Sequence, residues 1–590
     1  MAGSEPMVAD SSVSLGDLLD VLERLPSGEP VELTLADLDD LRALTVLAID
    51  RLPATTVRIT VKRYRPPLAR WRGSLGYLPG LASSRVSWPA ARTGPVEVEV
   101  VLREPLDLST VAAAVCDMLV PTNVAAFWGS PQLAVAPGTG ADVLALLPQP
   151  WALRPQVEPE PDVLLATDIL LAPPGFDASG IQHRSRVDVA PGPALGGTAG
   201  PLIDLRKHNP IGRLGKVGGE WPARRAQIST TGVDRWGLSV EGEPVVVLDS
   251  RAEIPSSVVE LLRPCSTLDL SGIDEPIDPA TAGALATRLA ELAATGVVLH
   301  SGAHLVQHVP TLASTVRDIM GRAAAPVSGF ANLALSVEQR RASMREHAGV
   351  LALGRAAEGL GAARMLPHVT ALLVTNRPEL VEHAVGLMVA QTYPYLDVLV
   401  VTHGRSAPDT NAWSDEARAK LSGCIELPAS VPFGDALALA TERAAGPLVL
   451  KIDDDDHYGP EFVWDLVLAR LFSGAQVVGK QAEFTYLEPF DVTVRRGFGV
   501  ETYSEQVAGG TMLMSVADIA QVGGWRGVPR AVDRALMQRF VKAGGVTYVD
   551  RGIGFVYVRH GRGHTWRADA GHFLRNAREQ WSGLFLPALG

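Results

Sequence analysis

The chain has 590 residues, of which 47% are hydrophobic and 20% are charged. One hydrophobic core does not extend over such a length, so two to four domains are expected in a globular protein. The formal net charge of −12, from 53 basic and 65 acidic residues, argues against general nucleic-acid binding.

The cysteines and the lack of a targeting pattern give an expectation for the compartment. The three cysteines stand far apart and form no metal or redox motif, which is typical of a reducing cytosol (Cys116, Cys265, Cys424). Residues 1–5 lack the basic start of a signal peptide, and no apolar run of about 18 residues is present. We expect a cytoplasmic protein, with peripheral contact at the inner face of the cell membrane left open.

Changes in composition along the chain predict the domain boundaries. We expect an N-terminal accessory domain over residues 1–147, a proline-rich linker over 148–162 and a second accessory domain over 163–330. Both are expected to be of α/β or α+β class, because helical and strand patterns alternate in them. A connecting helix and linker over 331–365 then lead to a C-terminal domain over 366–590.

Within the N-terminal domain, residues 58–92 carry eight basic residues and no acidic one (Arg58, Lys62, Arg63, Arg65, Arg70, Arg72, Arg85, Arg92). Aromatic residues are interleaved with them (Tyr64, Trp71, Tyr77, Trp88). In an acidic chain this asymmetry suggests a surface for anionic lipid head groups or for a charged glycan. A solvated basic face is the alternative.

Two helices farther along have sequence signals at their ends. The first has Asp278 as N-cap, Pro279 in its first position and Gly296 just past its end, with a strand directly after it. The second is predicted to begin at Ser336, where a capping-box pattern opens a charged segment that runs to about His347.

From residue 366 onward, strands and helices alternate regularly. Strands are predicted over 369–374 and 398–401, and helices over 379–391 and 434–445. Another apolar run, 448–452, follows the second helix. Alternation at this spacing indicates an α/β domain with a mostly parallel sheet.

The last of these strands ends in four consecutive aspartates, Asp453 to Asp456. Adjacent carboxylates repel one another, so a folded chain keeps them together where cations offset the repulsion. They follow a buried-type strand, and the carboxyl edge of an open α/β sheet is where ligands bind. Oxygen ligands suit Mg²⁺ or Mn²⁺, which usually bridge to substrate phosphates. A solvated acidic loop is the alternative.

Four ordered motifs in this region resemble the family 2 glycosyltransferases, which have the Rossmann-like GT-A fold. They are the segments "VTNRPE" from Val374, "LKIDDDDHYGP" from Leu450, "GGTMLM…VGGW" from Gly509 and "AVDRALMQRFVKAGG" from Ala531. The resemblance covers about residues 366–570 and does not extend to the N-terminal half.

The resemblance implies a divalent cation, Mn²⁺ or Mg²⁺, at the acidic cluster. Asp453 and Asp455 take the two positions of the family's Asp-x-Asp motif, and Asp456 is the aspartate that usually follows. A late histidine often completes the metal shell in this fold. His564 is the first candidate and His560 the second, and a structural role for both is the alternative.

The fourth motif places Asp533 on the aspartate of the helix that carries the family's catalytic base. Transfer to a hydroxyl group needs a base whose pKa lies near the working pH, and a partly desolvated carboxylate meets that need. A helix-capping or first-turn acid is the alternative. The family geometry implies inversion by a single displacement.

The remaining site residues are expected to contact the two substrates. Donor contacts are assigned to Thr375, Asn376, Arg377, His403, Asp453, Asp454 and Arg562. Acceptor contacts are assigned to Gly509, Gly510 and Trp525, whose ring offers a sugar a stacking face. His403 stands where family members commonly carry an aspartate pair that reads uracil.

The sequence therefore predicts an enzyme that moves a sugar from a nucleotide-diphosphate donor to a glycan or lipid-linked glycan, in cell-envelope or polysaccharide biosynthesis. Nucleic acid is not an expected partner. A degenerate transferase that binds glycans or acts as a scaffold is one alternative, supported by Val532 and His403. A nucleotidyltransferase is another, although the first strand is not followed by its glycine-rich phosphate loop.

Overall fold

The computed structural model describes, besides isolated positions and short strand segments, residues 30–38, 53–68, 80–91, 93–120, 201–213, 224–274, 279–326, 328–352, 366–561 and 570–590. The chain divides into two compact units. The first contains residues 1–125 and 131–196, and the second contains 197–359 and 363–590. This division differs from the predicted domains, because residues 163–196 belong to the first unit.

The first unit contains a five-stranded sheet in the order β1-β2-β3-β5-β4, in which β1, β2 and β3 are parallel and β5 is antiparallel to both of its neighbours. Alternate residues of β3, such as Val57 and Ile59, are buried together with the apolar side of α3. The elements are β1 (Val8–Asp10), β2 (Val31–Leu35), β3 (Pro53–Tyr64), β4 (Leu81–Ser87), β5 (Gly94–Asp107) and α3 (Leu108–Leu119). A parallel three-stranded sheet consists of β6 (Leu133–Val135), β7 (Leu165–Ala172) and β8 (Ile181–Asp188).

The second unit begins with a middle layer over residues 201–352, whose sheet has the order β11-β10-β9-β12-β13. Its strands are β9 (Arg224–Gly232), β10 (Arg235–Val240), β11 (Glu243–Asp249), β12 (Cys265–Gly272) and β13 (Val298–His300). Its helices are α5 (Ser256–Leu262), α6 (Pro279–Ala294), α7 (Ser314–Met320) and α8 (Gly329–His347). The predicted helix that starts at Pro279 is confirmed as α6.

The predicted start of the next helix, at Ser336, is wrong, because α8 already begins at Gly329. Ser336 lies in the middle of the helix and is buried. Its hydroxyl donates to the carbonyl of Gly296 at 2.6 Å instead of capping a helix end. The capping-box pattern is therefore a packing contact between α8 and the end of α6.

The C-terminal domain, residues 366–590, contains an eight-stranded sheet in the order β16-β15-β14-β17-β23-β19-β24-β22. Only β23 and β22 run antiparallel to their neighbours, so the predicted α/β class with a mostly parallel sheet is confirmed. The strands are β14 (Val369–Thr375), β15 (Leu396–His403), β16 (Leu421–Leu427), β17 (Leu448–Ile452), β19 (Val477–Lys480), β22 (Thr502–Ser504), β23 (Leu513–Ser515) and β24 (Thr547–Asp550).

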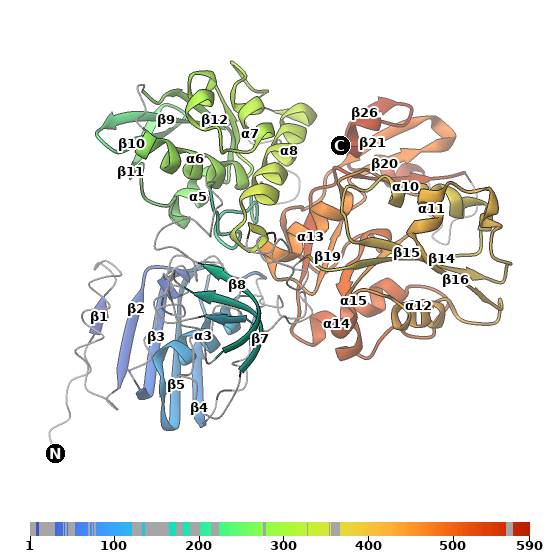
Figure 1. The fold of residues 1–590 in the computed structure, drawn as a ribbon, viewed down its shortest axis with the longest axis horizontal. Helices are drawn as coiled ribbons and strands as arrows, with labels where there is room; N and C mark the ends of the chain where they lie inside the picture. The colour runs from blue at the N-terminus through green and yellow to red at the C-terminus, as the bar shows by residue number, and fades with distance from the viewer. Residues whose placement is uncertain are drawn as a thin grey trace. The chain divides into compact units, whose positions relative to one another are not determined.

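Helices cover both faces of this sheet, with α10 and α11 on one face and α12, α14 and α15 on the other (Figure 1). The helices are α10 (Val381–Val389), α11 (Asp415–Lys420), α12 (Phe433–Glu442), α13 (Phe462–Ser473), α14 (Val516–Gln521), α15 (Val532–Lys542) and α16 (Ala570–Leu574). The predicted strands and helices of this domain match β14, β15, α10 and α12 within a few residues.

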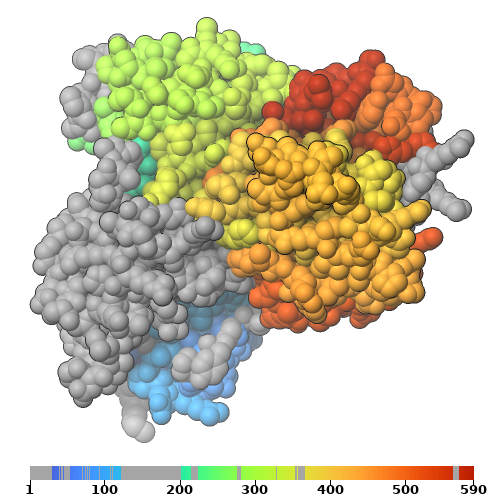
Figure 2. Space-filling model, turned by 45° about the vertical axis from the view of Figure 1, so that its right-hand side comes forward, coloured from blue at the N-terminus to red at the C-terminus, as the bar shows by residue number. Residues whose placement is uncertain are grey.

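A smaller sheet in the order β18-β25-β20-β21-β26 lies beside the large one. Its strands are β18 (His457–Tyr458), β20 (Phe484–Leu487), β21 (Val492–Arg496), β25 (Phe555–Arg559) and β26 (Ala577–Ser582). The middle layer, in green, and the C-terminal domain, in orange and red, have surfaces in contact in the space-filling view (Figure 2). Among the helices of the described residues, none combines the length and apolar character needed to cross a bilayer.

Candidate functional site

The strand order of the large sheet determines where the predicted site residues meet. In chain order the first four strands lie as β16-β15-β14-β17, so the chain reverses its direction of winding between β14 and β17. Leu373 pairs with Ile452 across these two parallel strands. The residues that follow, Thr375 to Arg377 and Asp453 to Asp456, therefore leave the same edge side by side. Open α/β sheets bind ligands at such a switch point.

Asp454 joins the ends of the two strands. It is only 5% exposed, and it accepts hydrogen bonds from the hydroxyl of Thr375 and from the guanidinium of Arg377. Burial raises the pKa of Asp454, while these two donors oppose the rise. Arg377 also contacts Asp455, with 2.8 Å between Nη2 and Oδ2. Asp454 thus holds the loop at residues 375–377 in place, and Arg377 supplies the positive charge between Asp454 and Asp455.

Lys451 connects the acidic cluster to the predicted base. Its ammonium is buried, 2.7 Å from Asp453 Oδ1 and 3.8 Å from Asp533 Oδ2, and it donates to the carbonyl of Gly509 at 3.2 Å. Asp533 stands in the first turn of α15, behind Ala531 in the left-handed conformation. Burial raises the pKa of Asp533, and Lys451 opposes that rise. Asp533 Oδ1 is buried without a hydrogen-bond partner among the described residues, which suits a group that receives a proton.

The Gly509-Gly510 turn packs directly against the carboxylates of Asp533 and Asp453. A Cβ atom on Gly509 would lie 2.3 Å from Asp533 Oδ2, and one on Gly510 would lie 2.8 Å from Asp453 Oδ2. No larger residue fits without displacing these side chains. The turn is fixed by Tyr458, whose hydroxyl accepts from the backbone N–H of Asp453 at 2.8 Å and donates to the carbonyl of Gly510 at 2.9 Å. Tyr458 was not predicted, since only this contact distinguishes it from an ordinary core tyrosine.

Asp455 and His560 present a donor set that fits a divalent cation. His560 Nδ1 lies 2.8 Å from the carboxylate of Glu488. Because a carboxylate accepts, Nδ1–H donates this hydrogen bond and Nε2 carries the lone pair of the neutral ring. That Nε2 is 3.8 Å from Asp455 Oδ2, too far for a hydrogen bond but within the span of two ligands of one ion. A histidine held by a carboxylate on its other nitrogen is the usual arrangement at metal sites.

Asp456 is more deeply buried than Asp453, Asp455 and His560. It is buried, and its Oδ1 accepts from the backbone N–H of Val558 at 2.9 Å. Burial and the neighbouring Asp453 and Asp455 raise the pKa of Asp456 well above its usual range. A cation held at the cluster would offset this repulsion.

Other predicted residues lie elsewhere. The ring of Trp525 is 6% exposed within the core beneath α12, and its Nε1 donates to the hydroxyl of Thr441 at 2.9 Å. The buried ring therefore offers a sugar little stacking surface in this structure, and the acceptor role of Trp525 stays a prediction. His403 Nε2 contacts the carbonyl of Val431, and Asn376 is exposed beside Arg377. Arg562 and His564 lie outside the described residues.

The basic segment of the first unit is balanced by acids from neighbouring strands. Arg58 pairs with Glu32 on β2 and with Glu97 and Glu99 on β5. Tyr64 is fully buried, and Trp71 and Trp88 are partly buried against the same core. No acidic residue is present within residues 58–92 of the sequence. The pairing of β3 with β2 and β5 nevertheless brings three acidic side chains next to Arg58.

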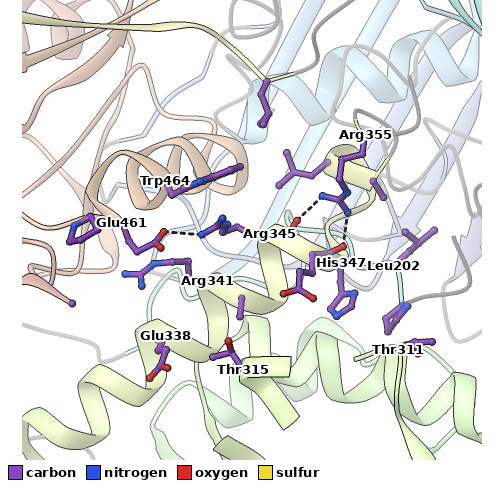
Figure 3. A pocket seen from close by; sticks show the side chains of 18 residues that line it. Leu202, Thr311, Thr315, Glu338, Arg341, Arg345, His347, Arg355, Glu461 and Trp464 are labelled. Carbon is purple, nitrogen blue, oxygen red and sulfur yellow. Dashed lines mark hydrogen bonds and ion pairs between the residues drawn. The ribbon is translucent and has the colours of Figure 1, made fainter. Parts of the chain in front are cut away.

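A cavity of about 910 Å³ lies in the second unit, away from the acidic cluster. Figure 3 shows Arg345 pointing to Glu461, a pair whose atoms are 2.9 Å apart. The guanidinium of Arg345 also lies over the ring of Trp464, 4.6 Å from its centroid. Arg355 donates to the carbonyls of Arg345 and Glu346. The cavity contains none of the predicted site residues.

No protein-family model matches the chain, and no curated protein is similar to it in sequence. A mannosyltransferase, PcManGT from Pyrobaculum calidifontis, solved with GDP-Man and Mn²⁺, is similar over 33% of this chain and 58% of its own length. The identity is 16% and the TM-score is 0.28. TarS residues 1–349 from S. aureus, solved with UDP-GlcNAc, is similar over 33% of this chain and 60% of its own, with 14% identity and a TM-score of 0.27. The chain thus spans about three fifths of the length of these structures.

Proposed function

We propose that the C-terminal domain is a metal-dependent GT-A glycosyltransferase that transfers a sugar from a nucleotide-diphosphate donor to a glycan or lipid-linked glycan. One observation carries the proposal: a cation-type donor pair, Asp455 and His560, and a largely buried carboxylate, Asp533, gather at the aspartates that follow β17. Asp455 lies 3.8 Å from His560, which follows β25, and Asp533 of α15 is linked to Asp453 through Lys451. The Gly509-Gly510 turn packs against Asp533 on one side and Asp453 on the other.

One set of residues would stabilise the departing diphosphate, and Asp533 would act on the acceptor hydroxyl. Asp453, Asp455, Asp456 and His560 would hold Mn²⁺ or Mg²⁺, which supplies a charge sink for a departing diphosphate. Arg377, already between Asp454 and Asp455, is placed to pair with a phosphate oxygen once a cation takes over Asp455.

Asp533 accepts the proton of the acceptor hydroxyl, and the sugar passes in one displacement with inversion. Its raised pKa brings the carboxylate closer to the working pH of a general base. Lys451 Nζ lies 3.8 Å from Asp533 Oδ2 and favours the ionised form of this carboxylate, which is the form that a general base needs. A role in cell-envelope or polysaccharide synthesis and a cytoplasmic location complete the proposal.

The experiment measures the release of nucleoside diphosphate by the full chain from a panel of UDP- and GDP-sugars, with Mn²⁺ or Mg²⁺ and with EDTA. We expect metal-dependent release that Asp455→Asn abolishes. Asp533→Asn should keep donor binding and lower transfer by about 10²–10⁴-fold, the usual contribution of a positioned base. Asp415→Asn, on the exposed first turn of α11, is the matched control and should have no effect. Full activity of Asp455→Asn would refute the metal assignment, and loss of donor affinity in Asp533→Asn would refute the assignment of the base.

A further inference from the structure

A second group of metal-type ligands lies in the middle layer, far along the chain from the acidic cluster. His208 comes from the turn at residues 204–209, Glu253 from the segment after β11, and Glu291 from α6. One ligand atom from each lies within 4.8 Å of the other two. The three residues come from separate parts of the sequence, so no local sequence motif predicts the cluster.

The protonation of His208 follows from its surroundings. The residue is fully buried, and its Nε2 lies 3.0 Å from the carbonyl oxygen of Ile254. A carbonyl can only accept, so Nε2 carries the hydrogen. Nδ1 is buried without a hydrogen-bond partner, and Glu253 Oε1 lies 3.9 Å from it, beyond hydrogen-bond range. With the hydrogen on Nε2, Nδ1 directs a buried lone pair toward carboxylate oxygens. Either a bound metal cation or a second proton on Nδ1 satisfies that arrangement without moving the ring, and a metal titration distinguishes the two.

The two carboxylates are oriented by the residues around them. Glu291 is buried, and its oxygens accept from the backbone N–H of Ile254 at 3.0 Å and from Arg288 at 2.6 Å. Glu253 is 46% exposed on its side chain and accepts from Lys207 at 2.9 Å. Glu291 is therefore fixed in place, as second-shell donors fix metal-binding carboxylates. Glu253 is the ligand that can move inward, because its own side chain is largely exposed and its ion pair with Lys207 is open to water on that side.

We propose that His208 Nδ1, Glu291 and Glu253 bind a divalent transition-metal cation, with water completing the shell on the exposed side of Glu253. One imidazole and two carboxylates suit Zn²⁺ or Mn²⁺ better than Ca²⁺. Tetrahedral zinc with bonds of about 2.0–2.2 Å places two ligand atoms about 3.3–3.6 Å apart. The present separations, up to 4.8 Å and 3.9 Å between His208 Nδ1 and Glu253 Oε1, therefore contract by roughly 1 Å or less when a zinc ion binds.

The proposed cation would join three segments of the middle layer near its junction with the C-terminal domain. The chain that follows His208 reaches that domain directly, since the backbone N–H of Gly212 donates to the carbonyl of Glu501 at 2.6 Å. Glu501 in turn is paired with Arg340 of α8 and with Arg551. A bound ion therefore stabilises the turn that leads into this contact, and its role is structural.

The test uses the full chain with Asp455→Asn, so that the proposed catalytic site is disabled and the outcome does not depend on its function. After treatment with chelator, zinc is added and followed by calorimetry, by metal analysis after gel filtration and by the melting temperature. We expect one zinc per chain with a raised melting temperature. Adding Glu253→Gln should weaken binding at least tenfold, which is the usual loss when one ligand is removed, and His208→Asn should abolish it. Glu243→Gln, on exposed β11, is the control and should leave binding unchanged.

Two outcomes overturn the proposal. The first is that no zinc binds at micromolar concentration. The second is zinc binding that Glu253→Gln leaves at full strength. Glu253 is exposed, so this variant folds even where His208→Asn does not, and it decides the question alone.

Discussion

At the scale of single residues, two basic side chains hold the carboxylates of the acidic cluster in position. Arg377 lies between Asp454 and Asp455, and Lys451 lies between Asp453 and Asp533. The sequence predicts the aspartates because they are consecutive and end a strand. It does not predict the link from Lys451 to Asp533, because only the packing of α15 against β17 brings these two residues together.

This link gives a pH prediction for Lys451→Met. Burial raises the pKa of Asp533 and Lys451 opposes the rise, so removal of the ammonium raises that pKa further. An opposite charge at this distance commonly lowers a carboxyl pKa by about 1–3. A base must be ionised, so the acid limb of the pH–rate profile should move to higher pH by about one pH unit or more. Activity should fall more at pH 6 than at pH 9.

The pH–rate profile of nucleoside diphosphate release measures this shift. Lys542→Met, at the exposed end of the same helix, is the matched control and should leave the acid limb in place. A uniform loss of activity at every pH would show instead that Lys451 acts only by holding Asp453.

At the scale of elements, α8 is a shared part of the middle layer and the C-terminal domain. Arg340 pairs with Glu501 and with Asp550, and all three side chains are buried. Arg340 and Asp550 are 210 residues apart in sequence, so no window of the sequence contains the pair. Burial alone would raise the pKa of Glu501, but Arg551, Arg340 and Arg213 lower it to about 2. Arg340 of α8 thus acts with Arg551 and Arg213 to keep the buried Glu501 ionised.

Arg340→Ala should destabilise the second unit by about 3–5 kcal/mol, because it leaves buried carboxylates without a partner. Arg345→Ala is the matched control on the same helix. Its side chain is 34% exposed and its partner Glu461 is 22% exposed, so a loss of about 0–1 kcal/mol is expected. Urea unfolding of the two variants measures the difference. Equal losses would contradict a special role for the buried arginine.

The strands and helices of the C-terminal domain could be predicted from sequence because each has a strong local signal. Strand β14 is an apolar run between turn residues, and α12 has apolar positions at helical spacing. The start of α8 at Gly329 could not be predicted in this way. Its first turns are stabilised by distant residues, since Leu333 and Val337 pack with Phe484 of β20. A local capping pattern at Ser336 was stronger than any signal at the true start.

At the scale of the whole molecule, the C-terminal domain is not complete when cut at residue 366. Phe330 of α8 packs edge-on against Phe484, Trp581 and Phe585, with ring centroids 5.8, 6.1 and 4.9 Å away. Without α8 these rings of the smaller sheet would be exposed to water, and the buried carboxylates Glu501, Asp550 and Asp465 would each lose an arginine. The sequence places the boundary after this helix because composition changes there, and composition does not report which domain a helix packs against.

The boundary is therefore tested with two fragments. Residues 197–590 keep α8 together with both of its neighbours, and we expect one cooperative thermal transition and weak binding of a hydrophobic dye. Residues 366–590 expose the aromatic cluster and three buried carboxylates with fewer partners, so we expect strong dye binding and no cooperative transition. Adding α8 as residues 324–590 should restore part of the cooperativity, since it covers the aromatic cluster but leaves its own opposite side without α6. A fragment 366–590 that melts like 197–590 would show that α8 belongs to the middle layer alone and that the arginines of α8 do not support the C-terminal domain.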